Sequence, residues 1–154
     1  MTHSTRSSLL AAALSVAVAA PFDLADFEDV PAAELNIKNP LTGKPTEAVI
    51  ELAGPEHPVR KRIAFERARR ARAAMMRTGK VQLTDPEDDE ATETDDLVQM
   101  TLGWRGLVIG GAPIEHTPAA ALALYTDPKR RWLREQVREF LEERKAFIQP
   151  SAAG

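Results

Sequence analysis

Residues 33–53 have the sequence AELNIKNPLTGKPTEAVIELA, which predicts a β-hairpin. Apolar and polar residues alternate from Glu34 to Lys38 and again around Ile50, which is the period of a strand with one buried face. The segment 39–45 between them is rich in Asn, Pro and Gly, the residues that reverse a chain. A two-stranded hairpin is marginally stable alone in water, so we expect it to pack on other elements or on another subunit.

A strongly basic helix is predicted directly after the hairpin, over residues 58–78. Pro58 suits the first turn of a helix, and Gly79 suits its end. Between Arg60 and Lys80 the chain has nine basic residues and one acidic residue, and its alanines and methionines leave only a thin apolar stripe. We therefore expect a mainly solvated helix with one narrow apolar face.

The charge reverses in the next segment, because residues 85–96 contain eight acidic residues and no basic ones. Thr84 or Asp85 can cap a helix with Pro86 in its first turn, where acidic side chains are favourable. The pattern predicts a helix over 86–102 that lies antiparallel to the basic helix, so that the opposite charges attract. Exposed ion pairs contribute only about 0–1 kcal/mol each, so these charges would set the register more than hold the fold.

An irregular connection and two further helices are predicted for the C-terminal part. Glycines within 103–111 end the acidic helix, and helices follow over 118–125 and 129–147. Apolar residues recur in the last helix at spacings of three and four, which gives it one apolar face. The expected core anchors of this part are Trp104, Trp132, Val137, Phe140 and Leu141.

Together these elements predict a mainly α protein of the α+β class, with an N-terminal β-hairpin followed by a small helical domain. Aromatic residues make up only 5% of the chain and alanine is abundant, which favours a small helical core. The predicted parts are a flexible Ala-rich arm (1–21), an acidic connector and β-hairpin (22–55), a helical domain (56–148) and a disordered tail (149–154).

Residues 1–20 leave two interpretations open. Arg6, an apolar run over 9–20 and small residues at 17–19 match the form of a secretory signal. Pro21 would be a poor residue at the cleavage site, and the run is weakly hydrophobic and too short for a confident membrane span. We favour an arm ahead of the fold and expect no membrane association.

Composition excludes several classes of site. The chain has no Cys, which excludes a disulfide framework, a thiol nucleophile and a cysteine-ligated metal. Its three His are scattered and its serines lie near the termini, so no Ser/His/Asp arrangement is indicated. The acidic run at 85–96 lacks the Gly and Glu positions of a calcium loop, and the glycines at 103–111 do not form a phosphate-binding loop. We expect no enzymatic activity, no cofactor and no metal.

The basic segment from Arg60 to Arg77 could contact phosphates. It contains one aromatic residue, Phe65, so it offers no platform for stacked bases, and the net charge of the chain is −3. A solvated helix face paired with the neighbouring acids is the simpler interpretation. We therefore expect no nucleic-acid partner, although a DNA-associated factor stays open as an alternative.

The order of segments over residues 23–148 carries a resemblance. The turn NPLTGKPT at 39–46 lies inside the hairpin, and LAGPEHP at 52–58 precedes the Arg-rich helix. LGWRG at 102–106 leads to a short helix, and the last helix contains WLREQVREFL at 132–141. This order resembles the tail assembly chaperones of long-tailed, siphovirus-like bacteriophages and related prophages.

The resemblance implies a non-enzymatic viral protein of virion assembly that works in the host cell cytoplasm. Such chaperones coat the phage tape-measure protein, keep this long helical chain soluble and help to recruit tail-tube protein subunits. They are generally absent from the finished tail. Self-association is a further possibility, since the hairpin needs a partner. The residues that we expect to bind the partner are Met75, Met76, Phe140 and Phe147.

Two other functions stay open. The chain could be a structural virion protein of the phage tail or the head–tail junction, in which the hairpin adds strands to a neighbour's sheet. It would then be found in the virion tail. A secreted or envelope protein rests only on residues 6–20.

Overall fold

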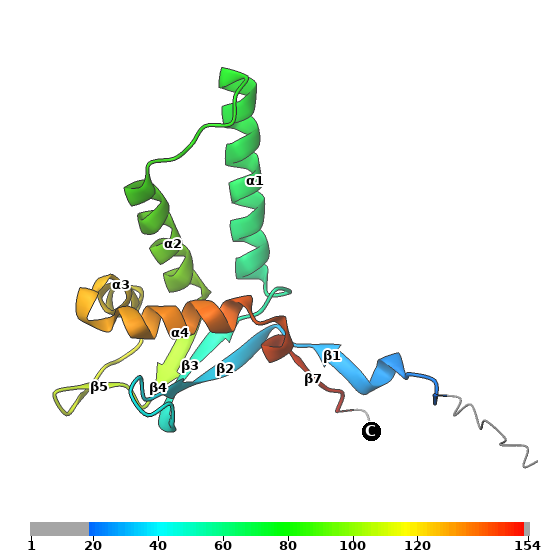
Figure 1. Ribbon diagram of the computed structural model, residues 1–154, viewed down its shortest axis with the longest axis vertical. Helices are drawn as coiled ribbons and strands as arrows, with labels where there is room; N and C mark the ends of the chain where they lie inside the picture. The colour runs from blue at the N-terminus through cyan, green and yellow to red at the C-terminus, as the bar shows by residue number, and fades with distance from the viewer. Residues whose placement is uncertain (1–18, 153–154) are drawn as a thin grey trace, which may run out of the picture.

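The computed structural model describes residues 19–152 and has a mixed α+β fold (Figure 1). Its helices are α1 Pro58–Thr78, α2 Pro86–Met100, α3 Pro118–Thr126 and α4 Arg131–Glu142. Its strands are β1 Phe27–Asp29, β2 Ala32–Lys38, β3 Pro45–Ala53, β4 Thr101–Arg105, β5 Val108–Ile109, β6 Ala112–Pro113 and β7 Ile148–Pro150. The predicted arm at 1–21, with its alternative as a secretory signal, lies outside the described residues up to residue 18.

The predicted hairpin is confirmed as β2 and β3, which pair antiparallel with Leu35 opposite Ile50. Its turn is held by Asn39, whose side-chain oxygen accepts hydrogen bonds from the backbone N–H groups of Leu41 and Thr42 at 2.9 and 3.1 Å. Gly43 has φ +70°, a conformation that glycine adopts without strain. The local turn chemistry therefore sets the register that directs Leu35 and Ile50 into the core.

A third strand extends this sheet, where the sequence predicts the end of a helix and an irregular connection. Helix α2 ends at Met100 rather than 102, and β4 follows at once and pairs antiparallel with β3. The hydroxyl of Thr101 donates to the carbonyl of Leu97 at 2.7 Å as the chain leaves the helix. Trp104 then lies opposite Ile50 and packs against the core. The prediction of an irregular segment was wrong because packing of Trp104 stabilises a short strand that contains a glycine.

The two ends of the described chain pair with each other. Strand β1 lies antiparallel to β7, with Phe27 opposite Pro150, and the N–H of Ser151 donates to the carbonyl of Asp26 at 2.8 Å. The prediction of a disordered tail from residue 149 was therefore wrong for residues 149–151. Backbone hydrogen bonds between segments more than 100 residues apart order this part of the tail.

The last helix is shorter than the predicted range of 129–147. Residues 128–130 form a separate 3₁₀ turn, and α4 ends at Glu142. Glu143 has extended backbone angles, φ −79° and ψ 95°, and a second 3₁₀ turn over 144–147 follows. This bend places Phe147 in the core, where it is fully buried.

One core joins the sheet to the helices, because Leu35, Ile50 and Leu52 cluster with Val137 and Phe147. Other members of this cluster are Ile37, Leu97, Ala121, Tyr125, Leu133 and Leu141.

The predicted core anchors have different outcomes. Val137 and Leu141 are buried as expected, and Trp104 and Phe140 pack against the core while partly exposed. The prediction for Trp132 was wrong, since it is 37% exposed. The apolar face of α4 is formed by Leu133, Val137 and Leu141 at spacings of four. Trp132 lies about 100° round the helix from Leu133 and so misses this face.

Candidate functional site

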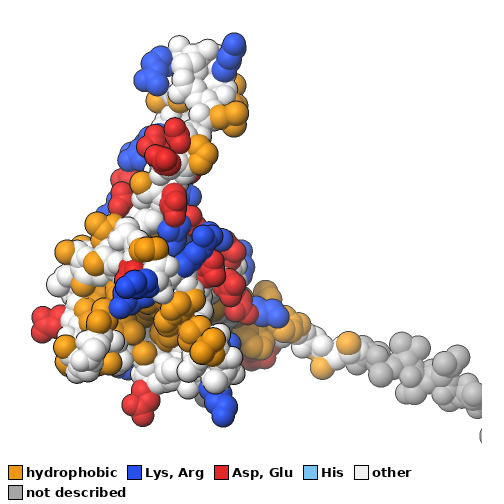
Figure 2. All heavy atoms as spheres, turned by 60° about the vertical axis from the view of Figure 1, so that its left-hand side comes forward, with side chains coloured by type: hydrophobic (Ala, Val, Ile, Leu, Met, Phe, Trp, Pro, Cys, Tyr) orange, Lys and Arg blue, Asp and Glu red, His pale blue; other side chains and the backbone are white. Residues whose placement is uncertain are grey.

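Helices α1 and α2 and the loop 79–85 form a projection that we call the helical arm. It stands away from the body of the molecule in Figures 1 and 2. The structure describes all of α1, and Ile63, in its second turn, is the only buried residue of this helix. The buried residues of α2 all lie within its last two turns, at Thr94, Asp96 and Leu97. The arm is therefore anchored at its base, and its outer half is open to solvent.

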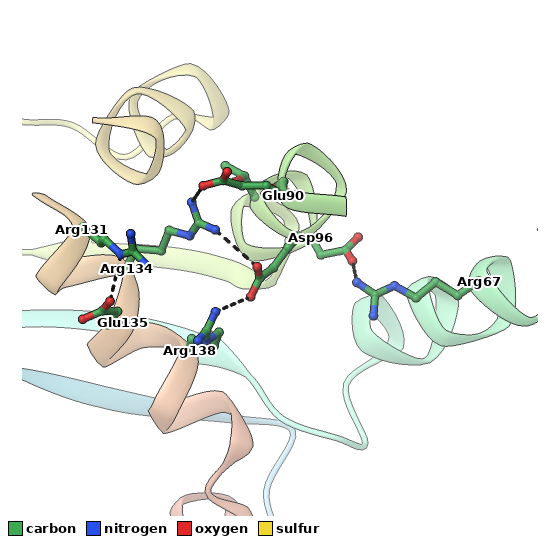
Figure 3. Close-up of polar contacts among 9 residues, drawn as sticks. Arg67, Glu90, Asp96, Arg131, Arg134, Glu135 and Arg138 are labelled. Carbon is green, nitrogen blue, oxygen red and sulfur yellow. Dashed lines mark hydrogen bonds and ion pairs between the residues drawn. The ribbon is translucent and has the colours of Figure 1, made fainter. Parts of the chain in front are cut away.

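Helix α2 is fixed to the body by an ionic junction with α4 (Figure 3). Arg134 donates to Glu90 and Glu93 of α2 at 3.0 and 3.3 Å, and Arg138 donates to Glu93 at 3.1 Å. The hydrogen bond with Glu93 raises the pKa of the Arg138 guanidinium. The side chains of Arg134 and Glu93 are 16% and 35% exposed, so the ion pair between them is less screened by solvent than an ordinary surface ion pair.

Helix α1 is held by three arginines of its first half. The guanidinium of Arg60 donates to the carbonyls of Leu141 and Ala53 at 3.2 and 3.5 Å, and its burial lowers its pKa. Arg62 donates to the side chain of Gln99 at 3.2 Å. Arg67 forms an ion pair with Asp96, a buried residue of α2.

The expected pairing of the basic helix with the acidic helix is present only in the part of the helical arm nearest the body. Within the described residues, Asp96 is the one acid of α2 that pairs with α1, and Glu90 and Glu93 pair with α4 instead. Five cations of the outer arm form no ion pair with any described residue, namely Arg69, Arg70, Arg72, Arg77 and Lys80. The same holds for the α2 acids Glu87, Asp88, Asp89 and Asp95.

Two opposite faces of α1 are available for contact. The first, which we call the groove face, borders a groove of about 800 Å³ between α1 and α2. Its α1 side is formed by Arg67, Arg70, Ala71, Ala74 and Met75, and the far side by Val81, Gln82, Thr84, Asp89, Thr92 and Glu93.

The second face, which we call the outer face, lies on the other side of the same helix. It contains Phe65, Arg69, Arg72 and Met76, which recur at spacings of four and three and therefore share one side. None of these four residues lines the groove. Phe65 is 62% exposed and Met76 is 80% exposed.

The four residues expected to bind a partner lie in two separate places. Met75 lines the groove and is 51% exposed, while Met76 is on the outer face. Phe140 and Phe147 instead pack edge to face in the body, with ring centroids 5.4 Å apart. Full burial removes Phe147 from the candidate contact surface, and Phe140 is partly buried against the core.

Sequence reasoning missed three exposed apolar residues of the arm. Phe65 stands in the sequence as an isolated aromatic of a basic helix, and Val81 and Leu83 lie in the loop that follows it. Val81 and Leu83 are both largely exposed. Large apolar residues within an otherwise charged or polar segment are a signal that could have identified all three.

Two histidines of the described chain make local contacts. His57 accepts the N–H of Val59 at 3.1 Å and caps α1, and His116 packs edge-on against Trp104 with ring centroids 4.7 Å apart. Among the described residues, no group of three or more His, Cys, Asp or Glu side chains is placed to hold a metal ion. Within the same residues, no helix is long and apolar enough to cross a membrane. The helical arm exposes both apolar and charged side chains.

Comparisons with protein-family models, with curated proteins and with solved structures find no significant match.

Proposed function

We propose that this protein is a non-enzymatic phage tail assembly chaperone. It binds the tape-measure protein in the host cell cytoplasm, keeps it soluble and helps to recruit tail-tube subunits. The helical part, residues 56–148, is the binding unit in this proposal, and the hairpin supports it through the shared core. The observation that carries the proposal is the outer face of α1, an exposed strip of apolar and basic side chains.

The outer face has the chemistry needed to cover an amphipathic helix. Burying a side chain such as Phe65 or Met76 contributes about 1.5–3 kcal/mol, so two such contacts give a weak and reversible bond. Methionine adapts its shape to different apolar partners. A helix of 21 residues is about 31 Å long, which is enough to lie along several turns of a partner helix.

The charge of this face favours a particular type of apolar stripe. Arg69 and Arg72 lie between Phe65 and Met76 and form no ion pair with a described residue. They would attract stripes that are flanked by acidic side chains. A long helical tape-measure chain presents repeated apolar stripes, so several copies can coat it. Weak single contacts allow each copy to be displaced when tube subunits polymerise.

Co-expression with the tape-measure protein tests the proposal. The tape-measure protein should be soluble with the wild-type chain and should co-purify with it. Met76→Asp should lower its soluble fraction. Leu41→Asp is the matched control, because Leu41 is 94% exposed but lies in the turn between β2 and β3. If the tape-measure protein is equally soluble alone, or never co-purifies, the proposal is overturned.

A structural virion protein of the tail or head–tail junction is the second candidate. Strand β4 is at the edge of the sheet and has no second strand partner among the described residues. An open edge can pair with a strand from a neighbouring subunit. Mass spectrometry of purified particles separates the two functions, since a structural subunit is present in stoichiometric amounts and an assembly chaperone is not.

A further inference from the structure

On the groove face of the helical arm, α1 and α2 make few contacts with each other. In the described chain, the side chains of α1 and α2 share one hydrogen bond, Arg62–Gln99, and one ion pair, Arg67–Asp96, both in the half near the body. Beyond them the helices are separated by the groove of about 800 Å³. Ala71, Ala74 and Met75 face this groove without being buried.

The outer half of the arm therefore lacks the packing that normally stabilises helices of this length. Isolated helices shorter than about 12–15 residues are marginal in water, and most helices in proteins rely on a buried apolar face. Met75 and Val81 offer apolar area to the groove, and the alanines permit close approach of another helix. A helix seated in the groove would supply the missing packing.

The two sides of the groove carry opposite charges, so the groove of one copy is complementary to the groove of another. Arg70 lines its α1 side and Asp89 its α2 side, and neither forms an ion pair with a described residue. The same division holds for the arm as a whole, because the cations without a described partner lie at 69–80 and the corresponding acids lie on α2. A two-fold axis would place Arg70 of each copy against Asp89 of the other, while Arg69 and Arg72 stay on the outer face.

We infer that the groove is filled by the arm of a second copy of this chain, giving a two-fold dimer. Helix α1 of each copy lies beside α2 of the other, and the four helices form a bundle with both arms pointing the same way. Within one chain, the ion pair Arg67–Asp96 places these two residues at the same height along α1 and α2. Arg70 is then about one helical turn from the level of the Asp89 position in the other copy, within reach of its long side chain. The outer face stays free, so this inference does not depend on the tape-measure proposal.

Sedimentation of the full chain over a range of concentrations measures the dimer, and two neighbouring substitutions separate the faces. Met75→Asp should raise the dissociation constant at least about 100-fold, because two buried methionines are lost per dimer. Met76→Asp, on the opposite face, should leave it unchanged. A wild-type chain that is monomeric at every concentration would overturn the inference and leave the groove to a different protein. A dimer weakened by Met76→Asp and not by Met75→Asp would overturn it too.

Charge reversal tests whether the contact joins two chains, and it does not depend on Met75. Arg70→Glu alone and Asp89→Arg alone should each weaken the dimer about tenfold, since each places two like-charge contacts in the interface. Mixing the two variants should restore it. In the mixed dimer the two substituted side chains meet as an opposite-charge pair, and the native Arg70 of one chain meets the native Asp89 of the other. Failure of the mixture to form a heterodimer, while the double variant in one chain behaves as wild type, would show that residues 70 and 89 pair within one chain, and it would contradict this arrangement of the dimer.

Discussion

Tyr125 of α3 contacts Thr101, the first residue of β4, through the hydroxyl groups of the two side chains. Its hydroxyl lies 2.7 Å from that of Thr101, and the residue is 2% exposed. Burial raises the pKa of Tyr125 to about 12. In the unfolded chain the phenol titrates near pH 10, so between about pH 10 and 12 only the unfolded state releases this proton. Stability from Tyr125 is therefore complete below pH 10 and is lost as the pH rises toward 12.

This predicts a pH dependence that Tyr125→Phe should remove. At pH 8 the variant should be less stable than the wild type by about 1 kcal/mol, the contribution of one hydrogen bond. At pH 11 the wild type should have lost about 1.4 kcal/mol through Tyr125, so the difference should close. Denaturant unfolding of both proteins at the two pH values provides the measurement. A difference that stays the same at pH 11 would contradict the assignment.

A second residue-scale prediction contrasts two aromatics near the ends of α4. Phe147→Ala should destabilise the fold by about 3–5 kcal/mol, because the side chain is fully buried. Trp132→Ala removes a larger side chain, but from a partly exposed position, so it should destabilise the fold clearly less than Phe147→Ala. Thermal melts of the two variants give the comparison. Equal losses, or a greater loss for Trp132→Ala, would mean that Trp132 belongs to the core after all.

At the scale of elements, the ionic junction determines where α2 lies. Arg134→Ala removes the described partner of Glu90 and one of the two partners of Glu93, and it should destabilise the fold by about 1–3 kcal/mol. Arg131→Ala is the matched control on the same helix, since its pair with Glu135 is exposed and should contribute about 0–1 kcal/mol. Hydrogen exchange should show faster opening of α2 only for Arg134→Ala. Similar behaviour of the two variants would argue that packing, and not charge, holds α2.

Elements whose ends are set by neighbouring residues could be predicted from the sequence. The hairpin follows from the turn formers at 39–45, and α1 begins at Pro58 and ends at Thr78, with Gly79 as its C-cap, as expected. Strands β4, β1 and β7 were missed because each is three to five residues long and depends on distant partners. A short strand with a glycine has no local signal that distinguishes it from a loop.

For the candidate site too, features set by neighbouring residues could be predicted from the sequence, and features set by distant residues could not. The exposed methionines and the charge of α1 could be predicted from the sequence. The partners of the acidic helix could not, because arginines of α4 more than 40 residues away compete with those of α1. Nor could the sequence show that the bend at Glu143 removes Phe147 from the surface.

At the scale of the whole molecule, a body with one core carries an arm that has little core of its own (Figure 2). Phe65 and Met76 face away from the groove, and Met75 lines it, so one helix offers two surfaces. In our proposals the groove face joins two copies of the chain and the outer face binds the tape-measure protein. The arm is then stabilised by its partners more than by the body.

Site-specific photocrosslinking in cells that co-express the tape-measure protein tests this arrangement most directly. A photoreactive amino acid at position 76 should crosslink to the tape-measure protein, because Met76 lies on the outer face of α1. The same amino acid at position 41, in the exposed turn between β2 and β3, should give no such product. A crosslink from position 41 and none from position 76 would contradict the arm as the binding surface.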